Sequence, residues 1–276
     1  MTTEAPAPLP HSPFAPDLFQ GKRAFVTGGG TGLGLQISRR LAALGAHVSI
    51  ASRNSEHHAA FLQEAEANGW SASAFVLDVR KLGDIAALVK QLREDGPIDL
   101  LVNNAAGNFV CPAERLTEGA WRAVLGIVLD GTFYCTREFG KGMIRDGGGV
   151  MLNVVATYAW TGMPGVVHSA SAKAGVLAMT RTLAVEWARH KIRVNAIAPG
   201  PFESTGASEN LWPDEGVKER MVRGIPAGRF ATAGEVADHA VWLLSSASDY
   251  VTGECFTMDG GASLGQGMWQ PGERVR

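Results

Sequence analysis

The chain has 276 residues, of which 46% are hydrophobic, and its formal net charge at pH 7 is −2. A chain of this composition can bury a sizeable core, and its charge gives no reason to expect a nucleic acid or an anionic membrane as a partner. Its three cysteines form no C-x-x-C pair and no histidine stands at metal-ligand spacing, so we expect a reduced, cytoplasmic protein with no metal site and no membrane span.

Residues 1–19 are predicted to form a flexible N-terminal arm. They open with the Pro- and Ala-rich run MTTEAPAPLPHSPFAPD, which has neither the basic start nor the apolar centre of a signal peptide. No linker or charge run interrupts residues 20–265, so residues 20–276 predict a single domain.

Short apolar runs then alternate with longer helical patterns, of which residues 35–45 are one example. Runs with almost no polar alternation are typical of strands that are covered on both faces. The repeated alternation predicts a single α/β domain with a doubly wound parallel sheet. The pattern breaks at about 202–229, where we expect a small helical flap over the substrate site. The predicted strands are 23–28, 47–52, 73–79, 99–105, 150–156, 193–199 and 255–260.

A glycine-rich turn, TGGGTGLG, joins the first strand to the first helix. Glycines let the backbone approach a pyrophosphate, and the start of the helix supplies free N–H groups and positive potential. A phosphate-loop motif is excluded because no Gly-Lys-Ser/Thr follows. The turn therefore predicts a dinucleotide cofactor, and the residues expected to bind it here are Thr27, Gly28, Gly30, Thr31, Gly32 and Leu33.

The second strand ends at Ser52 and is followed by Arg53, and both residues are expected to bind the cofactor. An NAD site would place a carboxylate there to accept from the ribose 2′-hydroxyl, and this chain has none. Arg53 can instead pair with a 2′-phosphate, which favours NADP. The alternative is that Arg53 is an ordinary solvated arginine.

The segment VVHSASAKAG places Lys173 on a helix that follows the fifth strand. Many nicotinamide-dependent reductases carry a tyrosine four residues before such a lysine, but here that position is Ser169. A serine hydroxyl is far too weak an acid to replace a phenol, whose pKa begins near ~10. Tyr158 and Asn108 follow strand ends, where ligands of such sheets bind. Tyr134 is expected to be buried on a helix and Tyr250 to be structural.

From about Gly21 to Gly261 the chain resembles the short-chain dehydrogenase/reductase family. The shared motifs are TGGGTGLG, Asp78-Val79, NNAAG at 103–107, Lys173 and the PGP turn at 199–201. The resemblance implies a Rossmann-like fold and, because the family is commonly tetrameric, a homotetramer. It also implies cofactor contacts from Asp78, Val79, Asn104, Ala105, Ala106, Gly107, Lys173, Pro199, Gly200, Pro201 and Phe202.

Two departures from the family pattern narrow the resemblance. Ser169 stands in place of the usual tyrosine, and Val128 stands in place of the usual asparagine of the middle helix. With these two departures, together with GNF after NNAA and the tyrosine of VVATY, the chain resembles the NADPH-dependent 2,4-dienoyl-CoA reductases of the mitochondrial type. The resemblance implies reduction of a 2,4-dienoyl-CoA to a 3-enoyl-CoA in unsaturated fatty-acid β-oxidation.

This reaction accounts for the departures chemically. Hydride enters at the far end of the conjugated system, and negative charge accumulates on the thioester oxygen. That oxygen needs preorganised hydrogen-bond donors, and the Tyr158 phenol and the Asn108 amide are suitable. We expect Ser169 and Lys173 to complete the catalytic group. Substrate contacts are expected from Arg80, Phe109 and Thr117.

Other interpretations stay open from the sequence. Tyr158 could pack on the core, Asn108 could cap a turn, Lys173 could be structural, and Arg80 and Phe109 could have surface and core roles. Functional alternatives are a 2-enoyl-CoA reductase, an NADP-dependent carbonyl reductase that uses Tyr158 as a displaced acid, and a non-catalytic NADP-binding protein. His57, His58, His168 and His190 are expected to face solvent or to cap helices.

Overall fold

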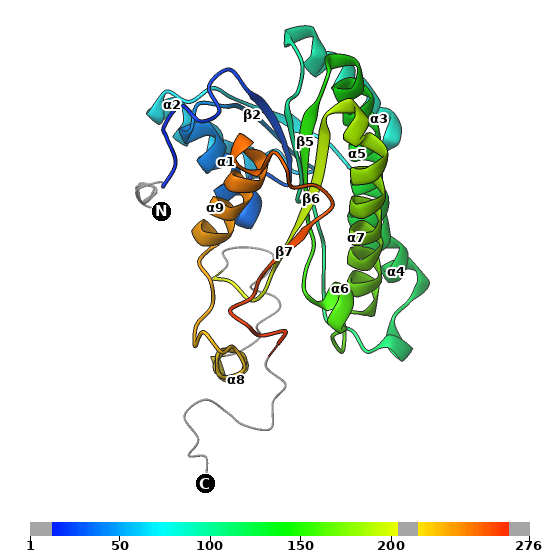
Figure 1. Cartoon of the computed structure of the whole chain (residues 1–276). Helices are drawn as coiled ribbons and strands as arrows, with labels where there is room; N and C mark the ends of the chain where they lie inside the picture. Colours follow the sequence, from blue (N-terminus) through cyan, green and yellow to red (C-terminus); the bar gives the residue numbers. More distant parts are fainter. Residues whose placement is uncertain (1–12, 204–214, 265–276) are drawn as a thin grey trace.

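A computed structural model describes residues 13–203 and 215–264 of the chain. Seven parallel strands form one sheet in the order β3-β2-β1-β4-β5-β6-β7, which confirms the predicted sheet (Figure 1). The third strand ends earlier than predicted because the chain turns at Asp78, whose backbone oxygen accepts from the Lys81 N–H at 3.0 Å. The strands are β1 Arg23–Thr27, β2 His47–Ser52, β3 Ala72–Val76, β4 Leu100–Asn103, β5 Gly149–Val154, β6 Ile192–Pro199 and β7 Cys255–Met258.

Helices cover both faces of the sheet. In Figure 1, α1, α2 and α9 lie on one face, and α3, α5 and α7 lie on the other. This arrangement gives the two-sided burial that the apolar strands predict. The helices are α1 Gly32–Ala43, α2 Glu56–Asn68, α3 Leu82–Leu92, α4 Glu118–Leu125, α5 Gly131–Asp146, α6 Tyr158–Thr161, α7 Val167–Trp187, α8 Glu215–Arg223 and α9 Ala233–Leu244.

Strand β1 shows how one strand supplies two cores. Ala24 and Val26 pack into the core beneath α1 and α9. Phe25 points to the opposite face, where its ring lies 4.6 Å from that of Phe139 on α5, measured between centroids. Each of these side chains is fully buried. Burying a large apolar side chain contributes about 1.5–3 kcal/mol, so both faces stabilise the sheet.

The carboxyl ends of β1, β4 and β5 meet in register. Thr27 pairs with Asn103, and Asn103 pairs with Asn153. The strand order reverses direction between β1 and β4, and ligands of open α/β sheets bind in the crevice at such a point. This edge therefore positions the candidate site.

A buried polar network holds that edge together. The Asn103 Nδ2 group donates to Thr136 Oγ1 and to Asn153 Oδ1, each at 2.9 Å. The Asn153 Nδ2 group donates to Thr180 Oγ1 at 2.9 Å. All four side chains are buried, so the network links β4 and β5 to α5 and α7 where the dielectric is low and hydrogen bonds are strong.

The predicted arm and flap are described only in part. Residues 1–12 of the arm lie outside the described residues, whereas Phe19 is buried and its N–H donates to Leu44 O at 2.8 Å. Residues 204–214 of the flap also lie outside them, and α8 falls within the rest of its predicted range. Among the described helices, none is long and apolar enough to cross a membrane.

Candidate active site

The glycine-rich turn after β1 has a shape that side chains would block. Gly28 and Gly32 adopt φ angles of 65° and 52°, which L side chains rarely adopt. A Cβ atom on Gly30 would lie 2.0 Å from the backbone oxygen of His57, and one on Gly34 would lie 2.1 Å from that of Gly28. The turn is thus a cradle lined by backbone atoms.

Helix α1 begins at Gly32 with its first N–H groups available. Its N-cap residue, Thr31, makes no side-chain capping bond, and no acidic residue lies in the first turn. The helix start therefore offers both N–H donors and positive potential to a phosphate. The glycine-rich loop and the first turn of α1 together fit the pyrophosphate of a dinucleotide.

Asn104 fastens this loop to β4. Its Nδ2 group donates to the backbone oxygens of Thr27 and Gly28 at 3.0 and 3.1 Å. The backbone N–H groups of Asn104 and Ala105 both donate to Thr27 Oγ1 at 3.0 Å. The predicted cofactor residues of β1 and β4 are thus in contact, and the amide donors of Asn104 hold the shape of the loop.

Two arginines and a carboxylate lie at the ends of β2 and β3. Arg53 is exposed, and in the described parts of the chain it forms no hydrogen bond or ion pair. Asp78 is held by Arg80, whose Nη2 group donates to Asp78 Oδ2 at 2.6 Å. Hydrogen bonds from Arg80 lower the pKa of Asp78 to about 2, and the nearby charge of Arg53 adds to this. Arg80, expected at the substrate, is therefore bound to Asp78, a predicted cofactor contact.

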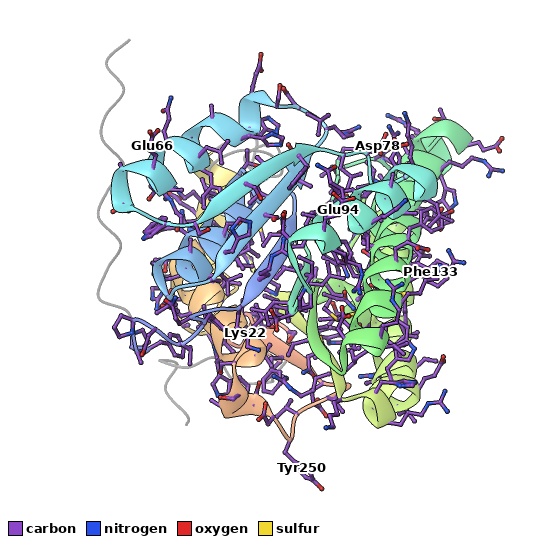
Figure 2. The ribbon with its side chains drawn as sticks, turned by 90° about the horizontal axis from the view of Figure 1, so that it is seen from above. Lys22, Glu66, Asp78, Glu94, Phe133 and Tyr250 are labelled. Carbon is purple, nitrogen blue, oxygen red and sulfur yellow. The ribbon has the colours of Figure 1, made fainter. Side chains whose placement is uncertain are left out.

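Tyr158 and Ser169 form the centre of the site. Tyr158 starts α6 directly after β5, and its Oη atom lies 3.0 Å from Ser169 Oγ in the first turn of α7. Burial raises the pKa of Tyr158, and the bond to Ser169 offsets this only in part, so the phenol stays protonated at neutral pH. The other tyrosines lie elsewhere, since Tyr134 is on α5 and Tyr250 is fully exposed and points away from the body of the protein (Figure 2).

Lys173 lies one helical turn after Ser169, on the same face of α7. Its side chain is buried, and its Nζ group donates to the backbone oxygen of Val154 at the end of β5. Burial lowers the pKa of Lys173 to about 8. The half-buried Tyr158 and the buried Ser169 and Lys173 thus lie together where β5 ends.

Asn108 presents its amide as a donor. The Asn108 Oδ1 atom accepts from the Phe109 N–H at 2.9 Å, which leaves Nδ2 without a hydrogen bond among the described residues. No hydrogen bond joins Asn108 to Tyr158 within those residues. The Phe109 ring packs against His168, with the ring centroids 4.4 Å apart.

The middle helix is apolar where the family carries asparagine. A π-helical turn, Gly126–Asp130, separates α4 from α5, and Val128 in this turn is fully buried. The backbone oxygen of Val128 accepts from Thr132 Oγ1 at 2.7 Å. Val128 thus has no polar side chain to offer to a proton relay.

Thr117, which is expected to contact the substrate, is the N-cap residue of α4. Its Oγ1 atom accepts from the Ala120 N–H at 3.2 Å.

The Pro-Gly turn after β6 closes the same edge. A Cβ atom on Gly200 would lie 2.6 Å from Cβ of Asp259, so only glycine fits there. Phe202 forms a parallel bridge with Ala231, which leads the turn toward α9.

Two histidines contradict the expectation from sequence. His58 and His168 are buried rather than solvent-facing, with 6% and 0% of their surfaces exposed. His58 lies on the inner face of α2, one turn before Phe61, and this apolar spacing was the available signal. His168 lies on the buried face of α7, which also carries Ser169.

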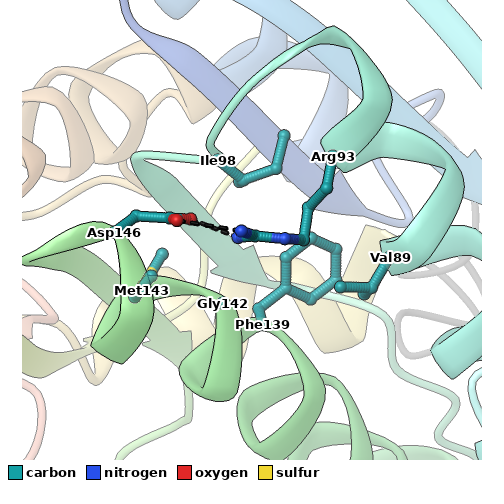
Figure 3. Close-up of a pocket in the computed structure, with 7 residues that line it drawn as sticks. All are labelled: Val89, Arg93, Ile98, Phe139, Gly142, Met143 and Asp146. Atoms are coloured by element: carbon teal, nitrogen blue, oxygen red, sulfur yellow. Dashed lines mark hydrogen bonds and ion pairs between the residues drawn. The ribbon is translucent and has the colours of Figure 1, made fainter.

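A recess between α3 and α5 lies away from this site (Figure 3). Ile98, which precedes β4, lines it, so the recess lies at the amino ends of the strands. The ion pair of Arg93 and Asp146 closes it. Within the described residues no group of three or more His, Cys, Asp or Glu side chains could hold a metal ion.

Comparison with known proteins places this geometry in a family. The family model described as enoyl-(acyl carrier protein) reductase matches residues 28–263. A probable 2,4-dienoyl-CoA reductase of Bacillus subtilis (strain 168), described as (2E)-enoyl-CoA-producing, is 45% identical over 246 residues, covering 88% of this chain and 97% of that protein. A peroxisomal 2,4-dienoyl-CoA reductase of Pongo abelii, described as (3E)-enoyl-CoA-producing, is 41% identical over 253 residues, covering 91% and 87%.

Solved structures agree with this placement. A short chain dehydrogenase from Bacillus anthracis str. 'Ames Ancestor' has a TM-score of 0.85 at 47% identity, covering 90% of this chain and 99% of that one. A gluconate 5-dehydrogenase from Burkholderia cenocepacia J2315, solved in complex with NADP and tartrate, has a TM-score of 0.85 at 32% identity, covering 90% and 98%. The chain therefore belongs to the short-chain dehydrogenase/reductase family.

Proposed function

We propose that this protein is an oxidoreductase that uses NADPH to reduce the conjugated double bonds of a 2,4-dienoyl-CoA, in the β-oxidation of unsaturated fatty acids. The observation that carries the proposal is the Tyr158–Ser169 pair beside Lys173, with the phenol displaced from its usual place on α7. The relatives named as 2,4-dienoyl-CoA reductases support it.

The cofactor half of the proposal rests on the cradle at the end of β1. Gly28, Gly30 and Gly32 form a loop that side chains would block, and α1 presents free N–H groups to a pyrophosphate. Arg53 offers to a 2′-phosphate a guanidinium that has no partner among the described residues. When bound, NADPH supplies the hydride. The NADP complex of the Burkholderia relative supports this choice of cofactor.

In the proposed mechanism the protein stabilises charge on the substrate oxygen. Tyr158 donates its phenolic hydrogen to the thioester oxygen and remains protonated, because burial raises its pKa. The Nδ2 group of Asn108, which has no hydrogen bond within the described part of the chain, supplies the second hydrogen bond. Ser169 fixes the phenol, and Lys173 places a positive charge nearby, which also favours the negative charge that forms on the thioester oxygen.

The carbon that receives the proton determines the position of the double bond in the product. Protonation at C2 of the dienolate gives a 3-enoyl-CoA, and protonation at C4 gives a 2-enoyl-CoA. We propose the 3-enoyl product, as the Pongo relative's name states for that protein. The 2-enoyl product is the second candidate, because the Bacillus subtilis relative is described as (2E)-enoyl-CoA-producing.

The test is a parallel assay of the purified protein with NADPH. We expect oxidation of NADPH with a 2,4-dienoyl-CoA and little with a 2-enoyl-CoA or a 3-ketoacyl-CoA. NMR of the product then distinguishes the two double-bond positions. Turnover of only the ketone would show a carbonyl reductase, and turnover of none of the three would favour a non-catalytic NADP-binding protein.

Arg53→Ala is expected to weaken NADPH binding by about tenfold to a hundredfold and NADH binding hardly at all, because a hydrogen-bonded ion pair to phosphate contributes roughly 1.5–3 kcal/mol. Titration calorimetry with each cofactor measures the two dissociation constants. Lys90→Ala, which removes an exposed positive charge from α3, is the control. Equal losses for NADPH and NADH would show that Arg53 does not contact the 2′-phosphate.

We also propose a homotetramer and a cytoplasmic location. Phe133 on α5 and Val185 on α7 support the assembly, since both apolar side chains are exposed and Figure 2 shows Phe133 pointing outward. The three unpaired cysteines are consistent with a reducing compartment. Light scattering after gel filtration tests the assembly, and a dimer or monomer would contradict it.

A further inference from the structure

A short hydrogen-bond chain lies at the end of β2, beside Arg53. The Ser52 Oγ–H group donates to the backbone oxygen of Asn54 at 2.8 Å. The same Oγ atom lies 2.8 Å from Nε2 of His58. Ser52 therefore has two partners, one on its own turn and one on α2.

The single hydroxyl hydrogen determines the direction of the second bond. Because that hydrogen is used on Asn54 O, the hydrogen between Ser52 and His58 must belong to the imidazole. His58 is thus an Nε2–H donor, and Ser52 is its acceptor. Burial lowers the pKa of His58, and so does the neighbouring His57, so the ring is neutral at pH 7 and the bond to Ser52 selects the tautomer that carries its hydrogen on Nε2.

This chain lies against the glycine-rich loop. The Gly28 N–H donates to the backbone oxygen of Ala51, the residue before Ser52, at 2.7 Å. The start of α2 approaches the loop so closely that a Cβ atom on Gly30 would lie 2.0 Å from His57 O. Ser52 and His58 therefore stand where the loop meets the end of β2, which is the 2′ side of a bound nucleotide.

We propose that His58 is a positioning residue for the 2′-phosphate of NADP. Because His58 donates to Ser52 Oγ, the hydroxyl hydrogen of Ser52 is not used on His58. The Ser52 hydroxyl can therefore rotate, so that its hydrogen leaves Asn54 O and bonds to a phosphate oxygen. Arg53 supplies the charge, and Ser52 supplies a directed hydrogen bond that a 2′-phosphate, being charged, accepts more strongly than a 2′-hydroxyl does. The inference rests on the proposed cofactor, and it adds a second contribution to the preference for NADP over NAD.

Binding measurements test this without turnover. Dissociation constants for NADPH and NADH are measured for the wild type and for the Ser52→Ala, His58→Met, His58→Gln and double Ser52→Ala/His58→Met variants. His58→Met removes the donor and keeps bulk, whereas His58→Gln keeps an N–H group near the position of Nε2. The free energy of unfolding of each variant is measured in parallel, and Gln serves as the folded test should Met fail to fold.

We expect Ser52→Ala to weaken NADPH about tenfold and His58→Met about fivefold, with NADH changed by less than about twofold. His58→Gln should restore most of the loss, and His58→Met should add little once Ser52 is alanine. Equal losses for both cofactors, no loss, or additive effects in the double variant would overturn the inference.

The wild type separates this inference from the proposed cofactor. Equal affinity of the wild type for NADPH and NADH would overturn the cofactor proposal, and this inference with it. A wild type that prefers NADPH and a His58→Met variant that keeps the full preference would overturn the role of His58 alone.

Discussion

Replacing Tyr158 with phenylalanine is expected to lower kcat for a 2,4-dienoyl-CoA about a hundredfold, while NADPH affinity stays unchanged. Loss of one preorganised donor to a developing oxyanion costs about 3 kcal/mol of transition-state stabilisation. The phenol belongs to this class of donor, since it is largely buried, protonated at neutral pH and fixed by Ser169 at 3.0 Å. Steady-state kinetics and cofactor titration measure the two quantities.

Ser169→Ala is the matched control for this prediction. Its hydroxyl orients the phenol, so we expect a smaller loss in the single variant and almost none when Tyr158 is already phenylalanine, because residues that act as a unit are not additive. Full activity of Tyr158→Phe would show that the ring only packs against the core. A large additional loss from Ser169→Ala would instead give the serine a direct role in chemistry.

Replacing Lys173 with methionine should change how the stability of the cofactor-free protein depends on pH. Burial lowers the pKa of Lys173 from 10.5 to about 8. Between these values the unfolded chain holds a proton that the folded chain has released, so wild-type stability rises with pH across this window. Below pH 8 both states are protonated, and the full cost of the buried ammonium, on the order of 3 kcal/mol, is present.

The stability advantage of Lys173→Met over the wild type should therefore shrink by about 3 kcal/mol as the pH rises from about 8 to 10.5. Urea unfolding across this range measures it, with Lys90→Met as the control because Lys90 is exposed on α3. Parallel pH curves for wild type and Lys173→Met would mean that the folded lysine titrates like a solvated one.

The sequence predicted the sheet because the requirements of a parallel strand are local. A strand that is buried on both faces must be apolar throughout, as β1 is from Ala24 to Val26, and a glycine-rich turn must precede a helix to hold a phosphate. Strand ends were less predictable, since β3 stops where Asp78 turns the chain. That termination depends on a turn rather than on apolar pattern.

Contacts between distant segments could not be predicted from spacing. Asn104 lies in a recognised motif, but its bonds to Thr27 and Gly28 depend on the pairing of β4 with β1. The bond of Arg80 to Asp78 joins residues only two positions apart, but it could not be predicted either, because it depends on the rotamers of both side chains. A polar side chain has several possible hydrogen-bond partners in a sequence, and its actual partner is known only when the fold shows which of them lies near it.

The buried network of Asn103, Asn153, Thr136 and Thr180 has a consequence for cooperativity. It bridges β4, which is bonded to the nucleotide loop through Asn104, and β5, which leads into α6 and Tyr158, so neither half can open to solvent without breaking polar bonds in the other. Amide hydrogen exchange in β4 and β5 should accordingly show the same opening free energy. A partly unfolded protein that still binds nucleotide but no longer positions Tyr158 should not accumulate.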